Sequence, residues 1–305
     1  MAAISTSGLS KNYGSVRALT DLDLEVGDGE LFGFLGPNGA GKTTTIRLLM
    51  GLLRPTAGRA EVAGRDAWGD AVEVHRSVGY LPSDPVFPRN VTGWEFLRHL
   101  GSLRGGVPDT RIRHLADRFE LDLSRPIQAL SRGNRQKVGV VQAFMHDPPI
   151  LILDEASSGL DPLKQATLNR LLRETVDGGR TVFLSSHVIA EVEEVADRVG
   201  IIRDGVLVAL EGVDELKARA VRRVEIRFAD AVDWEPFQRL PGVEQVEVRD
   251  RTLRLVATGS MDQLVKTAAR FEVETFTSDE ADLAEVFLTY YRDDDPDSDE
   301  GGDPS

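Results

Sequence analysis

Residues 36–53 read GPNGAGKTTTIRLLMGLL and follow directly on the apolar run ELFGFL of residues 30–35. The apolar run predicts a buried strand, and the helical spacing of Ile46, Leu49 and Leu53 predicts a helix behind the glycines. The sequence therefore predicts strand, loop and helix in that order.

The loop fits the pattern G-x-x-x-x-G-K-[ST] in the strand-to-helix context that this pattern needs. Its glycines let backbone N–H groups wrap a polyphosphate, and the helix N-terminus adds about half a positive charge. Lys42 would reach the β and γ phosphates, and Thr43 offers a hydroxyl to Mg²⁺. An accidental glycine-rich turn is the alternative, and both flanks argue against it. The predicted phosphate-binding residues are Gly36, Pro37, Asn38, Gly39, Ala40, Gly41, Lys42, Thr43 and Thr44.

Two adjacent acids, Asp154 and Glu155, end the apolar run ILILD of residues 150–154. Successive side chains of a strand point to opposite faces, so the two acids cannot share a role if strand geometry continues through both. In P-loop ATPases a strand-end Asp supports Mg²⁺, usually through water, which suits Asp154. Glu155 is then left to orient or deprotonate the attacking water. The alternative is a pair of solvated acids that open a loop.

His187 and Tyr13 are weaker candidates. His187 follows the strand predicted for TVFLSS, residues 181–186, at the edge where a doubly wound sheet binds its ligand. There it would hydrogen-bond the γ-phosphate or the water, or it is a helix-start residue without a partner. Tyr13 is either a ring that stacks on adenine or a packed core tyrosine.

The rest of the first two thirds of the chain predicts an α/β fold. Residues 54–70 have the Gly and Pro spacing of short antiparallel strands, and residues 91–146 are mostly helical in pattern. From residue 150 onward, apolar strands alternate with amphipathic helices. Such alternation predicts a mainly parallel sheet with helices on both faces.

The pattern changes from about Val221. Six segments then follow in the order β, α, β, β, α, β, which is the order of a ferredoxin-like α+β domain. A helix is predicted for DLAEVFLTYY, residues 282–291. The predicted divisions are residues 1–215, residues 216–291 and an acidic disordered tail of residues 292–305.

Composition narrows the classes of partner. The net charge is −14, and half of it comes from seven acids in residues 293–305, where no Lys or Arg occurs. The acidic body argues against nucleic-acid binding. The absence of Cys rules out disulfides and thiolate metal sites and fits a reducing cytosol. Neither a signal-peptide h-region nor an apolar run of membrane-spanning length occurs, so the chain is not expected to cross a membrane by itself.

A second anion site is predicted at LSRGN, residues 130–134. Ser131 is a plausible N-cap of the helix that follows, so its hydroxyl, the Gly133 N–H and the helix dipole converge. This site has neither a Lys nor a metal-ligand acid of its own. It therefore makes sense as a lid over a nucleotide held by another subunit, and the alternative is an ordinary capped helix start.

With these motifs in this order, residues 4 to about 215 resemble the ATP-binding subunit of ATP-binding cassette (ABC) transporters, a P-loop NTPase cassette with an antiparallel β arm and a helical subdomain. Residues 36–44 correspond to Walker A, and residues 150–155 correspond to Walker B. The other positions match the adenine-stacking aromatic at Tyr13, the LSGGQ signature at Ser131, Gly133 and Asn134, the D-loop at Ser158 to Asp161, and the switch histidine at His187.

The resemblance implies a function as well as a fold. It implies a cytoplasmic subunit that binds ATP and Mg²⁺, dimerises head to tail with a second copy and drives a separately encoded membrane permease. Glu155 and His187 would be catalytic, Thr43 and Asp154 would serve the metal, and Asp161 would contact nucleotide. The C-terminal domain and the spellings YLPSD and LSRGN are more similar to the drug and antibiotic exporter branch than to importers.

The chain departs from the family pattern in places. Ser83 stands where members usually carry a Gln that senses Mg²⁺, and its shorter side chain argues against direct coordination, which leaves Asp84 or a water as substitutes. The signature has Arg132 for Gly and Asn134 for Gln. DNA-repair cassettes are disfavoured because no heptads separate Lys42 from the signature. A single Walker A motif disfavours tandem translation factors, and the presence of Glu155 and His187 disfavours a regulatory binder that no longer hydrolyses ATP.

Overall fold

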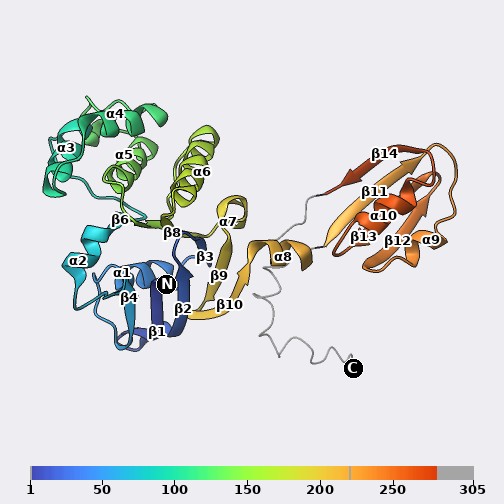
Figure 1. The fold of residues 1–305 in the computed structure, drawn as a ribbon, viewed down its shortest axis with the longest axis horizontal. Helices are drawn as coiled ribbons and strands as arrows, with labels where there is room; N and C mark the ends of the chain where they lie inside the picture. The colour runs from blue at the N-terminus through green and yellow to red at the C-terminus, as the bar shows by residue number, and fades with distance from the viewer. Residues whose placement is uncertain (1, 220, 280–305) are drawn as a thin grey trace, which may run out of the picture. The chain divides into compact units, whose positions relative to one another are not determined.

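The computed structural model describes residues 2–219 and 221–279 of the chain. The described residues divide into two compact units, one up to Leu210 and the other from Glu211 (Figure 1). The predicted end of the cassette at residue 215 falls inside helix α8 (Val213–Arg219), so the structural division lies slightly before it. The functional division into cassette and accessory domain stays a prediction.

A six-stranded sheet forms the centre of the first unit, with the strand order β10-β9-β3-β8-β7-β6. Strands β9, β3, β8, β7 and β6 pair in parallel, as the α/β alternation predicts. The strands are β3 (Leu31–Leu35), β6 (Val78–Leu81), β7 (Ile150–Asp154), β8 (Thr181–Ser186), β9 (Arg198–Arg203) and β10 (Val206–Gly212).

Apolar side chains on the central strands and the surrounding helices build the core. The ring of Phe183 on β8 lies 5.6 Å from that of Phe32 and 5.3 Å from that of Phe34, both on β3. All three are fully buried, which explains why these strands are continuous apolar runs. Helix α1 (Lys42–Leu49) packs against β7, while α6 (Pro162–Asp177) and α7 (Ile189–Val195) pack against β3 and β8.

An antiparallel sheet with the order β2-β1-β4-β5 forms the arm of this unit. Its strands are β1 (Ala2–Tyr13), β2 (Val16–Gly27), β4 (Ala57–Val62) and β5 (Arg65–Asp66). The short antiparallel strands predicted for residues 54–70 are confirmed as β4 and β5. Strand β1 carries register shifts on both sides, and Gly8 within it has a φ of 55°.

The helical part lies between β6 and β7 in sequence and groups beside the central sheet in Figure 1. It follows α2 (Ala71–Ser77) and holds α3 (Gly93–Leu103), α4 (Asp109–Arg118), the single turn η1 (Ile127–Ala129) and α5 (Arg132–Phe144). Helix α3 begins with a complete capping box, in which Thr92 and Glu95 each satisfy a backbone N–H of the other. The helical prediction for residues 91–146 is confirmed.

The second unit is a four-stranded antiparallel sheet with the order β12-β13-β11-β14 and two short helices. Its elements are β11 (Arg222–Phe228), α9 (Glu235–Gln238), β12 (Val243–Arg249), β13 (Thr252–Ala257), α10 (Asp262–Ala268) and β14 (Val273–Ser278). This is the predicted order β, α, β, β, α, β. Phe228, Phe237 and Phe271 meet in its core, with ring centroids 5.8 to 5.9 Å apart. The helix predicted for residues 282–291 and the acidic tail lie outside the described residues.

Candidate active site

The glycine loop connects the end of β3 at Leu35 to the start of α1 at Lys42. Gly39 and Gly41 have φ angles of 85° and 110°, which side chains other than glycine rarely adopt. A Cβ atom on Gly36 would lie 2.4 Å from the carbonyl oxygen of Ile202, closer than packing allows. The predicted strand, loop and helix are confirmed, and the glycines are required by backbone geometry.

Lys42 begins α1, and its ammonium group folds back over the loop. Its Nζ atom donates to the carbonyl oxygens of Gly36 at 2.6 Å and Pro37 at 3.2 Å. The same atom lies 3.3 Å from Oε1 of Glu155. The side chain is buried. A buried cation is thereby held at the mouth of the glycine loop by oxygen atoms alone.

Asp154, the last residue of β7, is fully buried and accepts two hydroxyl hydrogen bonds. Thr43 donates to its Oδ2 at 2.8 Å, and Ser185 at the end of β8 donates to its Oδ1 at 2.5 Å. Asp154 and Thr43, both predicted to serve the metal, are thus in direct contact. Ser185 was not expected from the sequence. The only signal for it is its place near the end of a strand next to β7.

Glu155 turns out of the strand. Strand β7 ends at Asp154, and Glu155 has a φ of 53°, in the left-handed region. The strand geometry therefore does not continue through both acids, so the condition on which the expected division of roles rested is not met. Separate roles for Asp154 and Glu155 stay a prediction. The Glu155 carboxylate lies 2.6 Å from Nδ1 of His187 through Oε2 and faces Lys42 through Oε1. Three residues named from the sequence, Lys42, Glu155 and His187, are therefore in contact.

The signature stretch begins α5 as expected. Ser131 is the N-cap, and its hydroxyl accepts from the Asn134 N–H at 3.2 Å. Asp161 caps α6 in the same way, accepting from the Lys164 N–H at 3.1 Å. Within the described part of this one chain, no hydrogen bond or ion pair joins Ser131 to the glycine loop. The two predicted anion sites of a single chain, at the starts of α1 and α5, are thus separate.

Comparisons with known proteins agree with this geometry. The sequence model of the ABC transporter family matches residues 19–158. The bacitracin transport ATP-binding protein BcrA of Bacillus licheniformis is 36% identical over 230 residues, covering 74% of this chain and 75% of that protein. The chain belongs to the ATP-binding proteins of the ABC transporter family. Accordingly, it binds ATP and hydrolyses it.

Two further relatives define the extent of the likeness. The daunorubicin resistance ATP-binding protein DrrA3 of Streptomyces coeruleorubidus is 35% identical over 312 residues, which cover 96% of each chain. A solved structure of the ATP-binding subunit of an ABC transporter superposes with a TM-score of 0.65 at 31% identity, over 70% of this chain and 92% of that one. The family likeness therefore extends beyond the cassette in the first case.

Tyr13 is the last residue of β1 and lies outside the core of this ABC protein. Its side chain is 45% exposed, and Nζ of Lys11 lies 5.3 Å from the ring centroid. The alternative of a packed core tyrosine is therefore excluded. Adenine stacking by Tyr13 stays a prediction.

Ser83 follows β6, which pairs in parallel with β7 so that Leu81 stands opposite Leu153. The loop that carries Ser83 and Asp84 consequently leaves the sheet at the same edge as Asp154. On β6 itself, burial and the nearby Asp154 carboxylate raise the pKa of Tyr80 to about 12. Its hydroxyl thus stays protonated at neutral pH and cannot serve as a base there.

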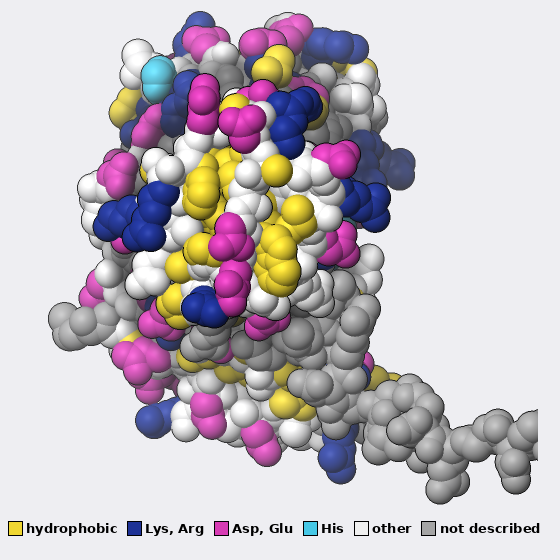
Figure 2. Space-filling view, turned by 90° about the vertical axis from the view of Figure 1, so that its right-hand side faces the viewer, with side chains coloured by type: hydrophobic (Ala, Val, Ile, Leu, Met, Phe, Trp, Pro, Cys, Tyr) yellow, Lys and Arg dark blue, Asp and Glu magenta, His cyan; other side chains and the backbone are white. Residues whose placement is uncertain are grey.

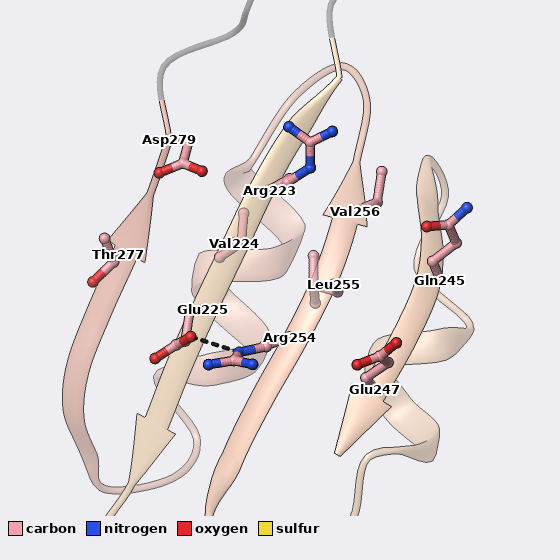
Figure 3. A pocket seen from close by; sticks show the side chains of 10 residues that line it. All are labelled: Arg223, Val224, Glu225, Gln245, Glu247, Arg254, Leu255, Val256, Thr277 and Asp279. Atoms are coloured by element: carbon pink, nitrogen blue, oxygen red, sulfur yellow. Dashed lines mark hydrogen bonds and ion pairs between the residues drawn. The ribbon is translucent and has the colours of Figure 1, made fainter. Parts of the chain in front are cut away.

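The second unit has a pocket of its own, of about 490 Å³, on the open face of its sheet (Figure 3). Charged side chains that pair across the strands line it: Nε of Arg254 lies 2.7 Å from Oε2 of Glu225. None of the predicted ATP-site residues lines this pocket. The predicted ATP-site residues all belong to the first unit.

Proposed function

We propose that this chain powers the export of an antibiotic or a similar amphipathic compound through a separate membrane permease. The observation that carries the proposal is the likeness to a daunorubicin resistance ATP-binding protein along 96% of both chains, second unit included. The likeness to a bacitracin transport ATP-binding protein supports the same class of cargo. Among the described residues no helix has both the length and the apolar character of a bilayer span. We place the chain on the cytoplasmic face of the membrane, held there by the permease.

Thr43 and Asp154 would hold Mg²⁺ together with the phosphates of ATP. A hydroxyl and a carboxylate 2.8 Å apart are hard oxygen donors of the kind that Mg²⁺ prefers. The described residues contain no cluster of three or more His, Cys, Asp or Glu side chains that could hold a metal alone. This fits Mg²⁺, which is commonly bound by one or two protein groups, substrate phosphates and water. The metal would neutralise charge that develops on the phosphates.

Glu155 would act as the base for the attacking water. In the structure its carboxylate faces Lys42, and phosphate oxygens would compete with it for that ammonium group. ATP binding would then leave the carboxylate paired with His187 alone and free to accept a proton from water. His187 would orient Glu155 and contact the γ-phosphate. Lys42 would stabilise the phosphates in ground and transition states alike.

The second anion site would serve a second copy of the chain. Ser131, Gly133 and Asn134 form a capped helix start without a lysine or metal ligand of their own, and Asp161 caps the helix after the D-loop. A head-to-tail homodimer would place each signature over the ATP of the other subunit. Nucleic acid is not a proposed partner. On the face drawn in Figure 2, basic and acidic side chains are interspersed, and its described residues form no continuous basic field.

Co-expression with the permease tests the proposal. A candidate permease would be the product of a neighbouring reading frame with about six apolar spans of 20 residues. Cells with both proteins are expected to accumulate less daunorubicin than cells with the permease alone. Lys42→Ala should abolish this difference and weaken ATP binding of the purified chain, because the cation at the phosphates is lost. Equal drug accumulation with and without the wild-type chain, in the presence of an expressed permease, would contradict the export proposal.

The second unit is proposed to be an accessory domain that hydrolysis does not need. All proposed ATP-site residues lie between Tyr13 and His187. A chain that ends after Arg219, which retains α8, is expected to keep ATP affinity and to hydrolyse ATP within about threefold of the full chain. Nucleotide titration and phosphate release measure this, with circular dichroism as the check on folding. A folded truncation without any hydrolysis would show that the second unit contributes to catalysis.

A further inference from the structure

The first turn of α5 does more than present the signature, because one of its sides packs against the loop that follows Glu155. A Cβ atom on Gly133 would lie 2.3 Å from the carbonyl oxygen of Gly159, so the two backbones are in close contact. The guanidinium of Arg132 donates to the hydroxyl of Ser158 at 3.2 Å. The start of helix α5 thus packs directly against residues 158–161 of its own chain, which correspond to the D-loop.

Gln136 extends this contact one turn further into the helix. Its side chain is buried, at 4% exposure, and its Nε2 atom donates to two successive carbonyl oxygens. These belong to Glu155, at 3.3 Å, and Ala156, at 3.2 Å. A buried amide that binds backbone oxygens fixes the direction of the peptide groups it contacts. The orientation of these two peptide groups sets the direction in which the Glu155 side chain leaves the backbone.

The Glu155 backbone needs such support. Its φ of 53° is a conformation that residues other than glycine hold only when the surroundings enforce it. On one side, its N–H donates to the carbonyl oxygen of Ser185 on β8 at 3.1 Å. On the other side, its carbonyl oxygen accepts from Gln136 and from the Ser158 N–H, the latter at 3.1 Å. Of these partners, Gln136 is the only side chain that reaches that carbonyl within the described residues.

We propose that Gln136 is a positioning residue for hydrolysis, which holds the left-handed backbone of Glu155 and so aims its carboxylate at Lys42 and His187. The inference rests on the proposed role of Glu155 as the base. It has a consequence for the dimer. Gln136 and Ser131 share one helix, so the helix start that would cover the partner's ATP is joined by hydrogen bonds to the catalytic carboxylate of its own chain. If α5 moved where it covers the partner's ATP, Glu155 of its own chain, which faces the other ATP, would then move with it.

The test uses Gln136→Met in the full chain, because Met has nearly the same length but no donor. Single-turnover hydrolysis is expected to slow by roughly 10- to 100-fold, the range for a small misplacement of a catalytic group. The ATP dissociation constant should stay within about twofold, since the hydrogen bonds of Gln136 found among the described residues go to Glu155 and Ala156 and not to the glycine loop. Gln142→Met on the same helix is the matched control, as no side-chain hydrogen bond of Gln142 is found among the described residues.

A double-mutant cycle with Glu155→Gln separates positioning from general damage. If Gln136 acts through Glu155, adding Gln136→Met to Glu155→Gln should slow the residual rate by less than about twofold. A full additional 10-fold loss would overturn the inference, and so would an unaltered rate in the single variant. If Glu155→Gln alone leaves hydrolysis intact, the proposed base itself is wrong and the inference falls with it. Should Gln136→Met not fold, Gln136→Asn shortens the same amide by one methylene and is expected to give the same pattern.

Discussion

Glu155→Gln is expected to slow ATP hydrolysis by roughly 10²- to 10⁴-fold, the usual loss when a general base is removed. The amide keeps the size of the side chain but cannot accept the proton of the attacking water. ATP affinity is expected to hold or to rise. In the structure Glu155 lies 3.3 Å from the Lys42 ammonium, and removal of its charge leaves that cation to the phosphates.

Equilibrium nucleotide binding and steady-state phosphate release measure the two effects separately. Glu191→Gln is a suitable control. Glu191 accepts a hydrogen bond from Ser186 at the end of β8, so this change removes a carboxylate charge four residues after His187 and leaves the contact between Glu155 and Lys42 in place. A Glu155→Gln chain that hydrolyses ATP within about twofold of the wild type would remove Glu155 from the catalytic role. Loss of ATP binding along with hydrolysis would instead point to a structural role for the carboxylate.

The sequence was sufficient to predict the parts of the site that local motifs define. The glycine loop, Lys42, Thr43 and the strand-end Asp154 are contiguous with apolar strands whose ends must meet at one sheet edge. Ser185 and Gln136 escaped prediction for the opposite reason. Each is an ordinary polar residue within an element. Only the pairing of β7 with β8 brings Ser185 to Asp154, and only the packing of α5 brings Gln136 to Glu155.

Backbone irregularities explain the other gaps. Strand β1 was not predicted because its register shifts and the left-handed Gly8 break the alternation by which a strand is recognised. The left-handed Glu155 gives no sequence signal either, since Glu is not a residue that favours this region. Helices α2 and α8 were not predicted, although α7 and α10 have the same length of seven residues and were. At Glu155, hydrogen bonds from distant parts of the chain, and not local preference, hold the backbone.

The assignment of Ser131 to the partner's nucleotide predicts complementation between two inactive variants. Gly133 is a poor place for the signature lesion, because any side chain there would collide with Gly159 and disturb Glu155 of the same chain. Ser131→Asp avoids this. Aspartate is as good an N-cap as serine, so α5 should keep its start, while a carboxylate would now face the γ-phosphate. Two like charges about 4 Å apart repel by about 4 kcal/mol at an effective dielectric of 20.

Homodimers of Lys42→Ala and of Ser131→Asp are both expected to fail in ATP-dependent closure, because each carries a lesion in both sites. A mixed dimer differs if the signature acts on the partner: both lesions then fall in one site, and the other site combines an intact Lys42 with an intact Ser131. Closure should therefore reappear on mixing.

Purification through two different tags isolates the mixed dimer, and light scattering with and without ATP measures closure. Ser131→Asn is the control, since it caps the helix without a charge and should close as a homodimer. If each signature served its own chain, every site of the mixed dimer would still hold one lesion, and a mixed dimer that closes no better than its parents would establish that arrangement instead.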